Sequence, residues 1–100
     1  MRFKRDDIYG AVNRERDFQD EKWGGVEENP HSILEWVTIM ERELQEAKEA
    51  WFQGPTKDVS EDMLSEIVQV VAVGIACLDQ YGYVEGHEGK TVEAEEETKT

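Results

Sequence analysis

Two short patterns of oxygen-bearing side chains have the spacing that metal-assisted hydrolysis uses. The sequence reads E-L-Q-E at 43–46 and E-I-V-Q at 66–69. Helical positions i and i+3 lie one turn apart on one face, so two such helices facing each other would gather three carboxylates and an amide. Like charges at this spacing repel, and a hard divalent cation such as Mg²⁺ reverses that cost because it prefers oxygen ligands. The candidate metal ligands are Glu43, Glu46, Glu66 and Gln69.

The same spacing also arises by chance on solvated helix faces, because the chain has 24 acidic residues. Against chance, Glu43 follows Trp36 by two turns, and Glu66 adjoins Ile67, so both acids border apolar stripes. Acids at the edge of a core are rarer than acids on a solvated face. Asp62, one turn before Glu66, either adds a ligand or helps to start the helix.

Gln69 is the only strongly polar side chain between Glu66 and Asp79. Burying an unpaired amide costs about 1–3 kcal/mol, so something must satisfy it. A hydrogen bond across a helical bundle would do so, and so would a place in or beside a metal or substrate site. The sequence leaves both possibilities open.

Two long helices are predicted to carry these patterns, over 33–52 and 62–80, after a first helix that runs to about residue 22. Steps of three and four residues mark the apolar stripe of the second helix. Its members are Ile33, Trp36, Val37, Met40, Leu44, Ala47 and Trp51. Asp6 or Asp7, then Asn29 before Pro30, then Asp58 or Ser60 are the predicted helix starts. Glycines at 24–25, 54 and 82 predict the ends.

The third helix is apolar on nearly every side. Its apolar residues are Ile67, Val68, Val70, Val71, Val73, Ile75 and Leu78. A helix apolar all round must be buried all round, and a chain of 100 residues with three helices cannot easily enclose it. The prediction is an all-α fold whose four-helix core is completed by dimerisation across a two-fold axis.

Composition limits the remaining possibilities. Residues 1–84 are predicted to form a single helical domain, and 85–100 an acidic, disordered tail. A net charge of −13 disfavours binding to nucleic acid and to anionic membranes, since both need clustered cations. No apolar stretch is long enough to span a bilayer, and no signal peptide is visible, so a cytoplasmic location is expected. His31 and His87 lack partners at zinc-ligand spacing, and Cys77 reads as a small buried hydrophobe.

The first helix carries the chief cationic and amide cluster of this acidic chain. Its members are Arg14, Arg16, Gln19 and Lys22, with Trp23 beside them. These side chains could contact phosphates while the indole stacks on a base. Alternatively, the arginines pair with neighbouring acids and Trp23 anchors the core.

Taken in order, these motifs resemble the MazG-like branch of the all-α nucleoside triphosphate pyrophosphohydrolases. The resemblance covers about residues 8–82 and rests on E-R at 15–16, Q-D-E-K-W-G at 19–24, Trp36, E-L-Q-E-A at 43–47 and E-I-V-Q-V-V-A-V at 66–73. The family signature is E-x-x-E on one helix and E-x-x-D on the next. Gln69 therefore stands where the family has aspartate.

The resemblance implies a helical homodimer or homotetramer that binds Mg²⁺, with Mn²⁺ as an alternative, through Glu43, Glu46 and Glu66. Such enzymes hydrolyse a nucleoside triphosphate, often a deoxy or non-canonical one, to the monophosphate and pyrophosphate. Glu43 or Glu46 would be the catalytic residue that orients or deprotonates water. Gln19, Lys22 and Trp23 would bind substrate, Lys22 at the phosphates and Trp23 or Trp51 at the base.

The Gln69 departure removes one unit of charge from the implied site. Either its carbonyl oxygen coordinates weakly, or Asp62 or a substrate oxygen substitutes, or activity is low. The alternative function is therefore a non-catalytic acidic helical dimer that binds a nucleotide or a protein partner.

Overall fold

The described part of the protein is built from three helices. The structure is a computed structural model that describes residues 2–52, 57–87 and 89. All regular elements longer than an isolated bridge in this part of the chain are helices, namely α1 (Arg5–Trp23), α2 (Ile33–Phe52) and α3 (Lys57–Tyr81). The all-α prediction is confirmed. Most of the predicted acidic tail lies outside the described residues.

α1 begins before the residues predicted to cap it. Lys4 is the N-cap residue and makes no side-chain capping hydrogen bond, so Asp6 and Asp7 lie in the first turn instead. There their negative charges interact favourably with the positive end of the helix dipole, although they cap no backbone group. The predicted end is confirmed: Gly24 has φ +86°, and its N–H donates to the carbonyl oxygen of Asp20 at 2.9 Å.

α2 has the predicted bounds, but its start is built differently. Ser32 Oγ accepts the Glu35 N–H at 3.1 Å, while Glu35 Oε1 accepts the Ser32 N–H at 2.7 Å. This reciprocal pair is a capping box, and its hydrogen bonds lower the pKa of the Glu35 carboxyl. The prediction of Asn29 as N-cap is wrong, because Asn29 Nδ2 donates back to the Trp23 carbonyl oxygen at 3.2 Å.

α3 is longer than predicted, because it begins at Lys57 and so takes in both Asp58 and Ser60, which were expected to cap it. It ends where the sequence indicates, at Gly82, whose φ is +86° and whose N–H donates to the Leu78 carbonyl oxygen. The predicted stop of α2 at 53–55 falls outside the described residues, although Phe52 is the last residue of that helix.

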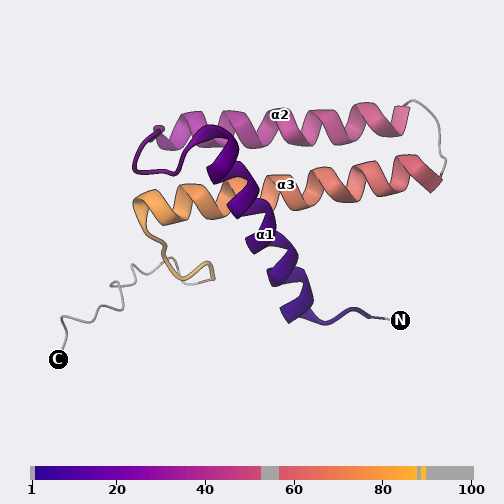
Figure 1. Cartoon of the computed structure of the whole chain (residues 1–100), viewed down its shortest axis with the longest axis horizontal. Coiled ribbons are helices and arrows are strands. Elements are labelled where there is room, and N and C mark those ends of the chain that lie inside the picture. The colour runs from indigo at the N-terminus through magenta and orange to yellow at the C-terminus, as the bar shows by residue number, and fades with distance from the viewer. Residues whose placement is uncertain (1, 53–56, 88, 90–100) are drawn as a thin grey trace.

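α2 and α3 lie side by side and antiparallel, and α1 crosses α3 obliquely (Figure 1). α3 packs against both other helices. A small apolar core joins α2 and α3, centred on Trp36, Val73 and Ala76, with Ile39, Met40, Cys77 and Val26 of the α1–α2 loop packed around it. Cys77 is thus partly buried, close to its predicted role. No described helix is long and apolar enough to cross a membrane.

One face of α3 is left uncovered in the single chain. Ala72, Val73 and Ala76 are buried, whereas the residues on the opposite side are between 41% and 47% exposed. These exposed residues are Ile67, Val71, Ile75 and Leu78. A single copy therefore does not enclose this helix.

Candidate functional site

Three glutamates from two helices meet at the α2–α3 contact. One carboxylate oxygen each from Glu43, Glu46 and Glu66 lies within 4.8 Å of the others. Glu43 and Glu46 are one turn apart on α2, and the antiparallel partner α3 brings Glu66 opposite them. We call these three residues the carboxylate cluster. It joins three of the four positions that the sequence proposes as metal ligands.

The cluster is partly withdrawn from water. Glu43 and Glu66 are half-buried, and Glu46 is exposed. Within the described residues, Glu43 Oε2 and Glu66 Oε2 are buried atoms that no hydrogen-bond donor reaches. Unpartnered buried carboxylate oxygens are costly, so this donor set suits a hard divalent cation, for which oxygen is the preferred ligand.

Burial is the largest of the causes that raise the pKa of Glu66 to about 7. A hydrogen bond and charge repulsion from Glu43 contribute to the same rise, and Asp62 adds repulsion. A hydrogen bond with Glu46 acts in the opposite direction. Glu66 therefore holds its proton close to neutral pH unless a positive charge replaces it.

Gln69 lies one turn beyond Glu66 but is engaged elsewhere. Its Nε2 donates to Ser65 Oγ at 3.3 Å, and its main-chain oxygen accepts a long hydrogen bond of 3.5 Å from Gln19 Nε2. The side-chain amide of Gln69 is thus satisfied within its own helix, and not by the hydrogen bond across the bundle that was one of the two possibilities. Whether Gln69 also coordinates a metal stays a prediction.

A cavity of about 360 Å³ adjoins the cluster. Residues from α1, the α1–α2 loop, α2 and α3 line it. They are Arg16, Gln19, Trp23, Gly24, Val26, Asn29, His31, Trp36, Ile39, Arg42, Glu43, Gln69 and Val73. We call this the aromatic cavity, because two indoles and an imidazole contribute to its wall. Glu43 belongs to both the cavity and the cluster.

A second, smaller hollow of about 270 Å³ lies on the other side of the cluster, where Glu46 and Glu66 line it together with Asp62. Asp62 is thus close enough to influence Glu66, as its effect on the pKa indicates. The sequence left its role open between ligand and helix start. Because α3 begins at Lys57, Asp62 does not start the helix.

Two of the three predicted substrate-binding residues line the aromatic cavity. Gln19 is 7% exposed and accepts a hydrogen bond from Arg16 through Oε1. Trp23 is 56% exposed, so it is not the core anchor that the alternative interpretation required. The third, Lys22, is not part of the lining: its Nζ lies 4.7 Å from the centre of the Trp23 ring.

The sequence did not single out Arg42 as a binding residue. Its side chain is exposed, but it also lines the aromatic cavity. Arg16, the other cation in the lining, is occupied by Gln19 Oε1 and by a salt bridge to Asp20. The spacing of Arg42 could have indicated this position, because it follows Ile39 by three residues, which places the two on one helix face, and it directly precedes Glu43.

Asn29 and His31 were also missed, because they come from the loop. Each lines the cavity from the segment between α1 and α2. Periodicity describes helices and strands, and it assigns no direction to side chains of an irregular loop. Nothing in the sequence pattern could have placed them there.

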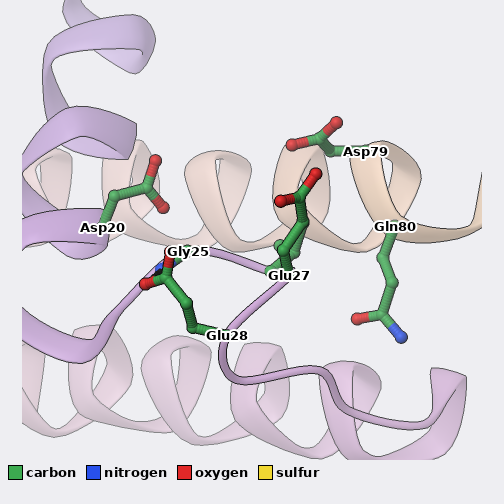
Figure 2. A pocket seen from close by; sticks show the side chains of 7 residues that line it. Asp20, Gly25, Glu27, Glu28, Asp79 and Gln80 are labelled. Carbon is green, nitrogen blue, oxygen red and sulfur yellow. Dashed lines mark hydrogen bonds between the residues drawn. The ribbon is translucent and has the colours of Figure 1, made fainter.

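A separate hollow of about 500 Å³ is acidic (Figure 2). Its carboxylates are those of Asp20, Glu27, Glu28 and Asp79. Asp20 pairs with Arg16, and Glu28 Oε2 accepts the Gly25 N–H at 3.2 Å. Half of its charge thus serves local structure, and we assign it no function.

Comparison of the chain with family models, with curated proteins and with solved structures finds no match. The resemblance to the MazG-like family therefore remains a prediction from the motifs. Any function must be argued from the carboxylate cluster and the aromatic cavity themselves.

The raised pKa of Glu66 predicts a specific dependence of stability on pH. The folded pKa of about 7 exceeds the ordinary value of 4.5, so ionisation of Glu66 costs the folded state stability as pH rises between these values. In a chelator, Glu66→Gln should match the wild type near pH 4.5 and be more stable near pH 8, by roughly 1–2 kcal/mol after allowance for solvent screening. Urea unfolding at the two pH values measures the free energy of unfolding of both proteins.

Glu41→Gln is the matched control, since Glu41 is an exposed acid on α2 outside the cluster. A stability difference for Glu66→Gln that stays constant between these two pH values would contradict the assignment.

Proposed function

We propose that this protein is a divalent-cation-dependent nucleoside triphosphate pyrophosphohydrolase. Water adds across the anhydride bond between the α and β phosphorus atoms, giving a nucleoside monophosphate and pyrophosphate. The supporting observation is that Glu43 is shared: it joins two other carboxylates on one side and lines a cavity with two indoles on the other. A charged, metal-suited group beside an aromatic cavity fits a polyphosphate joined to a base.

Glu43, Glu46 and Glu66 are the residues that would hold Mg²⁺ or Mn²⁺, with Gln69 as a fourth position. When bound there, the cation supplies positive charge against the phosphate oxygens. The raised pKa of Glu66 supports this assignment, because the same place favours a positive charge over a third carboxylate charge.

Glu46 is the best candidate for general base. It is the exposed member of the cluster, and a base must reach water as well as the substrate. Glu43 is the second candidate, as a residue that orients the same water molecule from the cavity side.

The cavity residues would bind the rest of the substrate. Trp23 and Trp36 offer the flat apolar surfaces on which a base stacks, and Gln19 offers an amide beside them. Arg42 supplies positive charge where the rest of the chain is strongly acidic. Lys22, held over Trp23, would reach phosphate only from outside the cavity. The house-cleaning of deoxy or non-canonical triphosphates is the substrate class that the family resemblance favours.

We further propose that the active form is a homodimer, or a tetramer built from it. Besides the exposed stripe of α3, α2 carries Val37, Leu44 and Trp51, which recur every seven residues and are between 41% and 50% exposed. Exposed apolar surfaces of this kind mark interfaces. Pairing two α2–α3 hairpins through this face would complete a four-helix core with two-fold symmetry.

The alternative, a non-catalytic dimer that binds a nucleotide or a protein partner, is favoured by one observation. Gln69 is neutral and is bonded to Ser65, so the fourth position supplies no carboxylate. In that case nucleotide and Mg²⁺ together would raise the melting temperature without forming product.

Activity should depend on Glu46. We expect Mg²⁺-dependent pyrophosphate release from a panel of ordinary, deoxy and modified nucleoside triphosphates, and we expect Glu46→Ala to lower kcat by about 100-fold or more, the usual worth of a general base. Glu41→Ala, an exposed acid on the same helix, should leave kcat within about twofold. Equal release by wild type and Glu46→Ala, or no release by either, would contradict the proposal.

Arg42 should affect substrate binding more than turnover. Arg42→Gln removes a charge–phosphate interaction, so the KM for nucleoside triphosphate should rise about five- to twentyfold while kcat changes little. Lys48→Gln removes an exposed positive charge from the same helix outside the cavity and serves as control. Steady-state kinetics of both variants measure this effect. Equal KM values for Arg42→Gln and Lys48→Gln would show that Arg42 does not bind substrate.

The assembly is tested through the exposed stripe. Val71→Glu places a charge at the centre of the proposed interface and should lower the mass measured by sedimentation; if the wild type is a dimer, the mass should fall to the 11.6 kDa of one chain. Tyr9→Glu, at an exposed position on α1, should leave the mass of the assembly unchanged. A monomeric wild type at micromolar concentration would refute the dimer.

A further inference from the structure

The α1–α2 loop forms one wall of the aromatic cavity. It contributes Gly24, Val26, Asn29 and His31 to the lining. Several of its hydrogen bonds are local: Asn29 N–H donates to the Gly25 carbonyl oxygen, and Asn29 Nδ2 donates to that of Trp23. Such bonds shape the loop without fixing it to the helices that carry the carboxylate cluster.

The carboxamide of Gln80 makes two of the hydrogen bonds that attach the loop to α3. Gln80 Oε1 accepts the His31 N–H at 3.1 Å, and Gln80 Nε2 donates to the His31 carbonyl oxygen at 2.7 Å. Tyr81 Oη donates to the same carbonyl oxygen at 2.8 Å. The side chain of Gln80 thus pairs with both polar groups of the His31 backbone, as a neighbouring strand would.

The same carboxamide also reaches the cavity wall in α2. Gln80 Oε1 accepts the indole N–H of Trp36 at 2.9 Å. Trp36 is 8% exposed and meets the His31 ring edge-on, with 4.7 Å between the ring centres. Figure 2 shows Gln80 extending from α3 toward the loop and α2, whereas its neighbour Asp79 points away.

We infer that Gln80 is a positioning residue for nucleotide binding: it fixes His31 and Trp36 together as one wall of the aromatic cavity. This inference rests on the proposed function, because it gives the cavity a nucleotide to bind. Gln80 itself is not among the residues that line the cavity, so it acts through its two partners.

A carboxamide is the side chain that this position requires. One oxygen must accept two N–H groups while the adjacent nitrogen donates to a carbonyl oxygen. A carboxylate could accept both but could not donate, and it would place negative charge against the His31 carbonyl oxygen. A thioether of the same length would do neither.

The carboxylate cluster does not use Gln80. Glu43, Glu46 and Glu66 lie on α2 and α3, and Gln80 is almost four turns beyond Glu66. Loss of the carboxamide should therefore loosen the cavity wall while leaving the chemistry of the cluster in place. That separation gives a kinetic signature which a general loss of stability would not produce.

The test compares Gln80→Met and Gln80→Glu with the wild type and with Asp79→Asn, the matched neighbour. At a temperature well below each melting point, the KM for nucleoside triphosphate should rise about five- to tenfold in both Gln80 variants, with kcat within about twofold. Asp79→Asn should leave both constants unchanged. Tyr81→Phe, which removes the other donor to His31, should raise KM less.

Hydrogen exchange of the indole N–H groups gives an independent readout. In the wild type the Trp36 indole N–H should exchange more slowly than those of Trp23 and Trp51, which are 56% and 50% exposed. The protection should be lost in Gln80→Met and kept in Gln80→Glu, which still accepts a hydrogen bond. An active wild type with unchanged KM in the Gln80 variants would overturn this inference alone. A wild type that neither binds nor hydrolyses nucleotide would overturn the proposed function and this inference with it.

Discussion

The carboxyl groups of Glu43 and Glu66 are held against each other between two antiparallel helices, and each has a buried oxygen atom without a donor among the described residues. Glu46 brings a third carboxylate to the same place. In water these charges would separate, but here the pairing of α2 with α3 keeps them together. Burial, together with this repulsion, raises the pKa of Glu66 to about 7. A proton or a cation must offset this repulsion, because the pairing of α2 with α3 keeps the carboxyl groups together.

The residues around the carboxylate cluster form both a small core and the aromatic cavity. Trp36, Val73 and Ala76 form a small core that fixes α2 against α3, and the same Trp36 forms part of the aromatic cavity. α1 closes the cavity from another side with Gln19 and Trp23. One set of contacts therefore stabilises the fold and sets the distance between the charged cluster and the aromatic wall. A substrate with a charged end and a flat apolar end fits such a site.

Much of this arrangement could be predicted from the sequence, because it follows from helical periodicity. The stripe that begins at Ile33 gave both bounds of α2, and the spacing of Glu43, Glu46 and Glu66 predicted that their side chains would meet. Gly24 and Gly82 marked the ends of α1 and α3 because their positive φ angles end helices. These features are local, so the pattern of residues was sufficient.

The features that escaped prediction depend on tertiary placement or on competing local signals. Asn29 before Pro30 looked like a helix start, but Ser32 and Glu35 cap each other three residues later and determine it. Arg42 was not predicted to bind substrate, because nothing in the sequence shows that a loop and α1 approach that side of α2. The role of Gln80 depends on the backbone of His31, almost fifty residues earlier, which no periodicity links to it.

Calorimetric titration with Mn²⁺ near pH 6.5, repeated in buffers of different ionisation heat, tests whether the carboxylate cluster binds a divalent cation. If the carboxylate cluster binds one divalent cation, binding should release most of a proton per site, because Glu66 is largely protonated at that pH. The observed heat should then change in proportion to the ionisation heat of the buffer, and this dependence should vanish in Glu66→Gln. Heats that are the same in every buffer, or the absence of binding, would contradict the account.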